Sequence, residues 1–118
     1  MESHNASTKH IMNEITNDEE KCSLGLGALK FVIDPEIGLN VVDLGLIYQL
    51  DFDETNKKLF CSHSLTTQFC PMGETINDGI TNALRQTFPD YEVDAQITFD
   101  PPWNSQKISE EGREFLNM

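Results

Sequence analysis

The chain has 118 residues, of which 38% are hydrophobic and 24% are charged, and it carries a formal net charge of -12. This length suits one domain with a buried core. The acidic excess argues against a nucleic-acid surface, because such surfaces use Lys and Arg to neutralise phosphates. The N-terminus lacks a basic and apolar leader, and no stretch approaches the roughly 20 apolar residues of a membrane span, so we expect a cytoplasmic protein without membrane contact.

The N-terminal part of the chain is polar and aperiodic, which predicts a flexible tail over residues 1–17 and a single domain over residues 18–118. Thr16-Asn17-Asp18-Glu19 resembles a capping box, and apolar residues follow it at helical spacing. We expect this first helix to end at Ile33, because the next residue precedes a proline and is biased away from helical geometry.

The middle and the end of the chain alternate apolar and polar residues, as strands do. Residues 46–52 and 59–65 predict a hairpin, and residues 91–99 predict a further strand. Between them, a helix is expected to open at Pro71 and to end before Pro89. This order predicts an α/β (α+β) fold with a small three-stranded mixed sheet, formed by the hairpin plus a crossover strand, and with helices packed mainly on one face.

Four loops at the ends of these elements do not look like ordinary connectors. They are Asp34-Pro35-Glu36, Asp43-Leu44-Gly45, Thr66 to Pro71, and Asp100-Pro101-Pro102-Trp103. The loop from Thr66 to Pro71 joins a strand to the start of a helix, which is where open sheets usually place ligand sites.

Cys70 is the main candidate for chemistry. With Pro71 at the first helical position, Cys70 is expected at the N-cap, where free N–H groups favour a thiolate that binds metal or attacks an electrophile. The hydroxyl groups of Thr66 and Thr67 could donate to the same sulfur. A half-buried cysteine that serves only as an apolar cap is an equally weighted alternative.

The other thiols are interpreted as core residues. Three cysteines cannot all pair within one chain, and a reducing cytosol would keep them as thiols. Cys22 and Cys61 lie on predicted buried faces. Cys61, His63 and Cys70 have the ligand types of a zinc site, but only three ligands are visible, and a core histidine explains His63 as well.

The remaining loop residues allow two interpretations each. Asp34 and Glu36 flank a rigid proline that could hold both carboxylates toward a metal, although Asp34 equally suits a turn at a helix end. For Asp43, a local role in a turn is favoured over a ligand role. Trp103 follows two prolines and is either a lid over the site or a core anchor.

Taken together, these segments resemble the metal-sulfur cluster biosynthesis family, which includes cytosolic iron-sulfur assembly factors and the phenylacetate-degradation protein PaaD. The similarity spans roughly residues 24 to 116. Its motifs are Leu29-Lys30 through Gly38, Val42 through Tyr48, and Thr66-Thr67 with Cys70-Pro71. The combination is specific, whereas each motif alone is weak.

The resemblance implies a role in maturing or delivering iron-sulfur clusters, with Cys70 as the reactive or ligating residue. A cluster normally takes four thiolates, so one cysteine would need a dimer, a partner's thiols or a small thiol. We therefore expect a non-enzymatic carrier or adaptor that handles iron or a cluster transiently. Its expected partners are apo iron-sulfur proteins or the assembly machinery, and a homodimer is left open.

Two other functions remain open from the sequence. One is a thiol-dependent enzyme with Cys70 as nucleophile, although no partner base is evident. The other is a PaaD-like accessory interaction module of a multicomponent oxygenase, in which the thiol is incidental.

Overall fold

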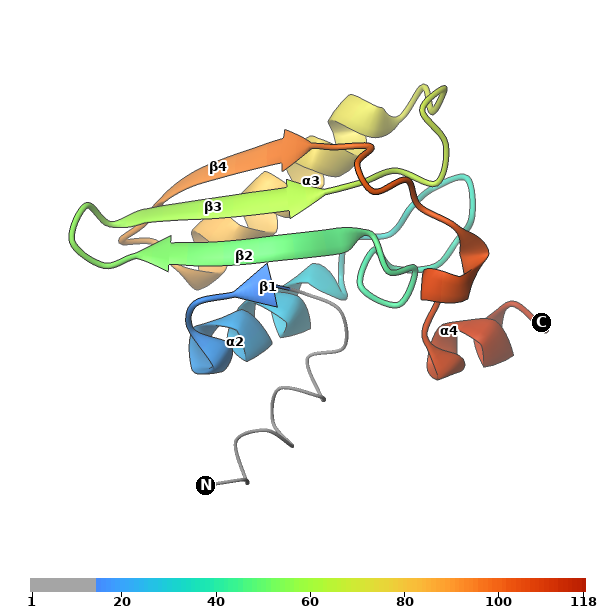
Figure 1. Cartoon of the computed structure of the whole chain (residues 1–118), viewed down its shortest axis with the longest axis horizontal. Coiled ribbons are helices and arrows are strands. Elements are labelled where there is room, and N and C mark those ends of the chain that lie inside the picture. The colour runs from blue at the N-terminus through green and yellow to red at the C-terminus, as the bar shows by residue number, and fades with distance from the viewer. Residues whose placement is uncertain (1–14) are drawn as a thin grey trace.

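The computed structural model describes residues 15–118, which form one mixed sheet with helices over it (Figure 1). The four strands lie in the order β1-β2-β3-β4. The elements in chain order are β1 (Ile15–Thr16), α2 (Glu19–Leu29), β2 (Ile47–Asp53), β3 (Lys58–His63), α3 (Gly73–Thr87), β4 (Glu92–Ile97), the 3-10 turn η1 (Ser105–Lys107) and α4 (Glu110–Phe115). No helix in this part of the chain is long and apolar enough to cross a membrane.

The predicted hairpin and crossover strand are confirmed. β2 and β3 pair antiparallel, and β3 and β4 pair parallel with Leu59 opposite Val93 and His63 opposite Ile97. Parallel neighbours need a crossover connection, which α3 supplies. The alternating sequence therefore identified these three strands, and the structure shows that the crossover strand β4 pairs with β3.

The prediction of three strands is wrong, because β1 adds a fourth. Ile15 and Thr16 pair parallel with Gln49 and Leu50 of β2. The next residue, Asn17, holds the same edge with its side chain, which donates to the backbone carbonyl of Phe52 and accepts from its N–H. The flexible tail predicted for residues 1–17 is therefore too long, because residues 15–17 belong to the folded domain. Residues 1–14 lie outside the described part of the chain.

Helix α2 begins two residues later than the capping box at Thr16 predicted, and it also ends earlier. The Asp18 side chain caps it by accepting the N–H of Lys21. The last helical residue is Leu29 instead of Ile33, because the N–H groups of Phe31 and Val32 bond three residues back and tighten the chain out of the helix. Ile33 then pairs with Asn40 in an isolated antiparallel bridge.

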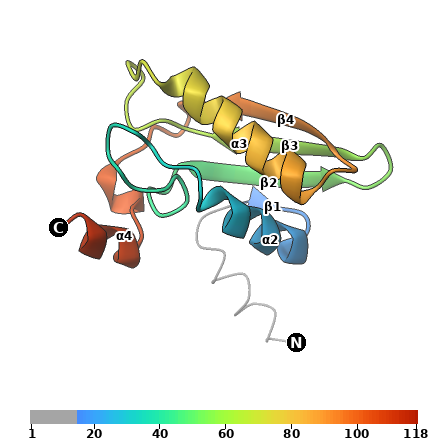
Figure 2. The same ribbon diagram turned by 180° about the vertical axis from the view of Figure 1, so that it is seen from behind.

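Helices α2 and α3 lie side by side over one face of the sheet, as predicted (Figures 1 and 2). Between the helices and the sheet lies one apolar core. Its aromatic end holds Phe52, Phe88 and Tyr91 in edge-to-face contacts with ring centroids 5.1 to 6.0 Å apart. Helix α4 lies beyond one end of the sheet (Figure 1).

Candidate functional site

The sequence motifs gather at one end of the sheet. β3 and β4 are parallel and both end there, whereas the antiparallel β2 begins there (Figure 1). The connections before β2, after β3 and after β4 consequently lie at the same end of the molecule. This is the end at which ligand sites of open sheets usually form.

Cys70 lies beside Glu36 at this end. Its sulfur is 4.0 Å from Oε1 of Glu36, although the two residues are 34 positions apart in the chain. Cys70 is half-buried, whereas Cys22 and Cys61 are fully buried. Cys70 is therefore the one thiol that a partner or metal can reach, and a carboxylate stands next to it.

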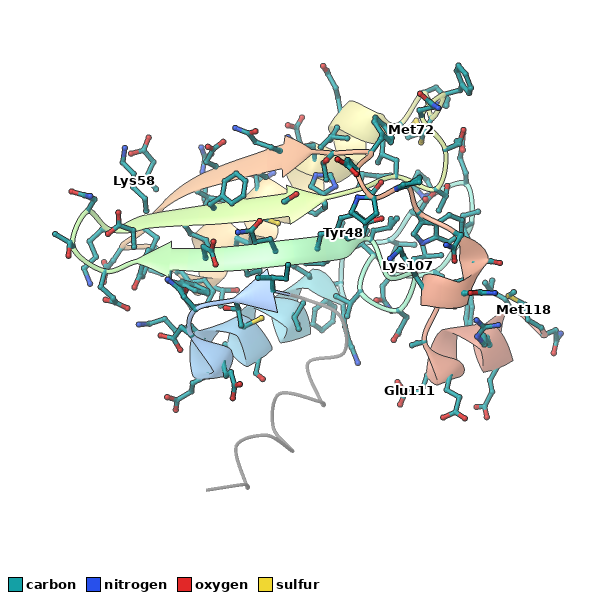
Figure 3. The ribbon with its side chains drawn as sticks, viewed as in Figure 1. Tyr48, Lys58, Met72, Lys107, Glu111 and Met118 are labelled. Atoms are coloured by element: carbon teal, nitrogen blue, oxygen red, sulfur yellow. The ribbon has the colours of Figure 1, made fainter. Side chains whose placement is uncertain are left out.

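The prediction that Cys70 caps α3 is wrong. The N-cap is Met72 (Figure 3), and α3 begins at Gly73. Pro71 therefore lies outside the helix, and Cys70 lies two residues before the cap. Two turns precede the helix, because the N–H of Cys70 donates to the carbonyl of Thr67 and the N–H of Gly73 donates to the carbonyl of Cys70. The thiol consequently does not occupy the position predicted to face the free N–H groups of the first turn.

Asp34 is buried beneath the same loop system and is only partly satisfied. Its Oδ1 accepts the N–H of Glu36 at 2.9 Å, and its backbone carbonyl accepts from Ile37 and from Gly38, which has a positive φ of 85°. Its Oδ2 is buried and has no hydrogen-bond partner among the described residues. Asp34 thus shapes the turn that presents Glu36, as the turn interpretation predicted, and keeps one oxygen unused.

The two threonines and Trp103 line a pocket on the other side of the cysteine loop. It has a volume of about 240 Å³, and its walls also include Phe69 and Phe99. The Thr67 hydroxyl accepts the N–H of Phe69, and among residues 15–118 no hydrogen bond joins either threonine hydroxyl to the Cys70 sulfur. Trp103 is partly buried against the core, so it combines an anchor with a pocket wall.

Asp43 anchors the C-terminal segment. Its carboxylate accepts from the Asn40 amide and from the Ser109 hydroxyl, both at 2.8 Å, and its backbone carbonyl accepts the N–H of Ser109. Ser109 is also the N-cap of α4. Asp43 therefore has a structural role, as favoured. Its role is not confined to a local turn, because two of these hydrogen bonds come from Ser109, far along the chain.

The residues that follow Asp43 hold the same segment. The Trp103 indole N–H donates to the carbonyl of Leu44 at 2.6 Å. Gly45 has a φ of 77°, and a Cβ there would lie 2.3 Å from the Lys107 carbonyl oxygen. The two motifs around Asp43 and Trp103 are thus partners of each other.

Sequence reasoning missed Tyr48 and Lys107 in this anchor. The Tyr48 hydroxyl donates to the carbonyl of Pro101, and the Lys107 ammonium lies over the Tyr48 ring, 5.2 Å from its centroid (Figure 3). The aromatic residue at the start of a strand was the available signal. Its partners, more than 50 residues away, could not be inferred from spacing.

The zinc interpretation is not supported by the geometry. Cys61 and His63 are both fully buried in the core, where burial raises the pKa of the Cys61 thiol to about 12. The His63 ring nitrogens lie 2.7 Å from Asn77 Oδ1 and 3.2 Å from the Ser64 carbonyl, and burial lowers its pKa. Residues 15–118 contain no group of three His, Cys, Asp or Glu side chains placed to share a metal ion.

Comparison with known proteins places the chain in one family. Residues 26–97 match the family model described as iron-sulfur cluster assembly protein. The chain is 36% identical over 84 residues to the Fe-S protein maturation auxiliary factor YitW of Bacillus subtilis, covering 71% of this chain and 81% of the relative. It is 34% identical over 80 residues to the Fe-S protein maturation auxiliary factor SufT of Staphylococcus aureus, covering 66% and 88%.

Solved structures show the same fold. A domain of unknown function from Bacillus anthracis superposes with a TM-score of 0.74 at 29% identity, over 80% of this chain and 89% of that one. A conserved hypothetical protein from Thermotoga maritima gives a TM-score of 0.68 at 34% identity, over 90% and 98%. The matched segment contains Asp34, Glu36, Asp43 and the whole cysteine loop, and the chain belongs to the iron-sulfur cluster assembly protein family.

Proposed function

We propose that this protein is a non-enzymatic carrier or adaptor in the maturation of iron-sulfur proteins, and that Cys70 is its point of contact with iron or a cluster. The observation that supports this role is the pairing of Cys70 with Glu36 at 4.0 Å, in a loop that leaves this thiol accessible. The buried and unused Oδ2 of Asp34 lies two residues from Glu36 in the same turn.

The number of thiol ligands in this chain explains why its contact with iron or a cluster would be transient. A cluster takes about four thiolates, and this chain offers one accessible thiol, so the remaining ligands come from a partner protein or a small thiol. A thiol that holds iron weakly and shares it with a partner can pass it on. Apo iron-sulfur proteins and the assembly machinery of the cytoplasm are the partners that fit this chemistry.

A thiol-dependent enzyme is less well supported. A nucleophilic cysteine needs a base within hydrogen-bond reach. His63, the one histidine among residues 15–118, has both ring nitrogens directed at Asn77 and Ser64 in the core. Glu36 is the nearest candidate to the sulfur, and the 4.0 Å between its Oε1 and the Cys70 sulfur exceeds the roughly 3 Å that usually separates a nucleophile from its base.

Anaerobic reconstitution with ferrous iron and sulfide tests the proposal. We would compare the wild type, Cys70→Ala and the matched control Cys22→Ala by visible absorption, bound iron per chain and cluster transfer to an apo-ferredoxin. Binding and transfer that require Cys70 and survive the Cys22 substitution support the carrier role. Equal transfer by the wild type and Cys70→Ala would refute the role of this thiol.

A further inference from the structure

An apolar groove runs along the exposed side of α3 and ends at the cysteine loop. Its walls are the segment 31–35 that follows α2 and one face of α3 between Met72 and Gln86, and its volume is about 460 Å³. We call it the α3 groove. No charged residue lines it, and Phe31 and Ile33 on its wall are 86% and 48% exposed.

Three contacts give the groove a direction. A Cβ on Gly25 in α2 would touch Leu84 and Phe88, and a Cβ on Gly79 would lie 3.2 Å from Val32. Further along, Glu36 lies beside Cys70. The segment 25–36 therefore runs antiparallel to the segment 70–88, as the path after α2 shows (Figure 2). Because Pro35 and Met72 line one end of the groove, that end lies near Cys70.

Two acidic residues in the first turns of α3 lie outside the groove lining, with Asp78 one helical turn from Asn82 of the groove wall. Glu74 and Asp78 are both exposed and lie one helical turn apart, and neither forms an ion pair or a side-chain hydrogen bond within residues 15–118. Like charges at this spacing repel each other and destabilise a helix. A cationic partner would relieve that repulsion at the end of the groove nearest Glu36 and Cys70.

We propose that the α3 groove binds a basic amphipathic helix of the protein that receives or supplies the iron-sulfur cargo. Apolar side chains of that helix fill the groove, and its Lys or Arg side chains face Glu74 and Asp78. The groove wall on α3 extends over 15 residues, or about 21 Å at 1.5 Å per residue, which fits a docked helix of similar length. The net charge of -12 further favours association with a basic partner.

This inference rests on the proposed function, because it places the partner's docking surface beside the thiol that shares the cargo. Thr75 and Ala83 are the small residues on the groove face of α3 that a partner can approach, whereas Gly79 accommodates Val32 of the opposite wall. A partner seated there would have one end at Pro35 and Met72, next to Cys70.

The test is an NMR titration of the ¹⁵N-labelled full chain with a synthetic helical peptide of Leu and Lys, about 14 residues long. The same peptide with Glu in place of Lys is the charge control. We expect shift changes confined to residues 31–35 and α3, and binding of the Lys peptide about tenfold tighter than that of the Glu peptide.

Variants locate the binding. Phe31→Ala should lower the affinity for the Lys peptide about tenfold, because burying a Phe side chain contributes a binding free energy of that order. Phe115→Ala removes an equally apolar side chain that is also exposed, on α4, and should leave the affinity unchanged. The double change Glu74→Lys and Asp78→Lys should weaken it too, whereas Glu110→Lys with Glu111→Lys, an equal change of charge on α4, should not. Because Phe31 and both acidic pairs are exposed, these variants are expected to fold.

Several results would overturn the proposal. These are shift changes centred on the open face of the sheet, equal binding of both peptides, or an unchanged affinity of Phe31→Ala. Concentration-dependent shifts at residues 31–35 and α3 without peptide would instead assign the groove to a second copy of the chain. Peptide binding should persist in Cys70→Ala, and iron binding should persist in Phe31→Ala, so failure of the docking proposal is distinguishable from failure of the carrier role.

Discussion

Substituting Gly45 by alanine should detach the C-terminal segment from the site. Gly45 has a φ of 77°, and a Cβ there would lie 2.3 Å from the Lys107 carbonyl oxygen and 2.8 Å from the carbonyl carbon. Both obstacles are backbone atoms, so rotation of a side chain cannot relieve the overlap. The η1 turn must move away from Gly45, and Trp103 and Ser109 flank that turn.

The cost follows from the contacts that this movement breaks. A non-glycine residue in the left-handed region costs about 1 to 3 kcal/mol. The bonds from Trp103 to Leu44 and from Ser109 to Asp43, three in all, contribute about 1 kcal/mol each. Because parts of the turn can relax, we expect a loss of about 3 to 5 kcal/mol in the free energy of unfolding, a large share of the 5 to 15 kcal/mol typical of a domain.

Urea unfolding followed by circular dichroism measures this loss, and the fluorescence of Trp103, the single tryptophan, reports the detachment. Gly27→Ala is the matched control, because Gly27 is exposed in α2 and a Cβ there meets nothing within 4 Å. The control should gain about 1 kcal/mol from helix propensity. A Gly45→Ala variant within about 1 kcal/mol of the wild type, with unchanged fluorescence, would refute the reasoning.

Three further changes test other parts of the structure. Burial lowers the pKa of His63, so the unfolded chain binds the extra proton, and stability should fall as the pH drops through about 6.5. Urea midpoints from pH 7.5 to 5.5 should show this decline in the wild type and a weaker one in His63→Gln; equal declines would exclude His63 as the cause. Asp34→Asn keeps the oxygen that accepts from Glu36 and replaces the unpartnered Oδ2 by an amide nitrogen that does not bind iron, so bound iron should decrease while circular dichroism shows that the chain still folds; unchanged iron would remove Asp34 from the site. Hydrogen bonds from Lys21 lower the pKa of Glu54 to about 2, so the contribution of this carboxylate should be present above pH 4.5 and disappear toward pH 2. Acid titrations of the wild type and Glu54→Gln should therefore converge at low pH, and curves that stay parallel would contradict this assignment.

The alternation of apolar and polar residues predicted the longer strands of the sheet but not the shortest one. β2, β3 and β4 each have six or seven residues with one buried face, so their alternation was visible in the sequence. β1 has two residues and no period of its own. It is a strand because the edge of β2 offers backbone groups to pair with, and that edge exists only after the sheet has formed.

Two predicted helix boundaries are wrong for a related reason, whereas the predicted end of α3 before Pro89 is confirmed. Proline fixes its own backbone and that of the preceding residue, which suggested Ile33 as the end of α2 and Pro71 as the start of α3. In the structure, tight turns at Phe31 and Val32 end α2 before Pro35 is reached, and a turn from Cys70 to Gly73 that contains Pro71 precedes α3. A proline therefore limits how far a helix can extend, but it does not determine the residue at which the helix begins or ends.

The loop motifs have two different physical roles that could not be distinguished in the sequence. One group surrounds Cys70, and the other anchors the C-terminal segment. The turn shaped by Asp34 presents Glu36, whose Oε1 lies 4.0 Å from the Cys70 sulfur, and Asp34 keeps one buried oxygen without a partner. The polar groups of Asp43 and Trp103 instead form hydrogen bonds that join their two segments. The bond from Trp103 to Leu44 connects residues that are 59 positions apart in the chain. Spacing along the chain could not separate the two sets, because both lie in loops at the same end of the sheet.

This division indicates where specificity toward a partner must come from. The chain offers one reachable thiol to a cluster that takes about four thiolates, so the affinity for the cluster alone is low in the proposed role. Selectivity then depends on the surface around Cys70, which is apolar on the α3 groove side and aromatic on the Trp103 side. A change on either surface should slow transfer to a particular partner at low partner concentration and leave the saturated rate intact, whereas a change at Cys70 should lower the saturated rate for every partner.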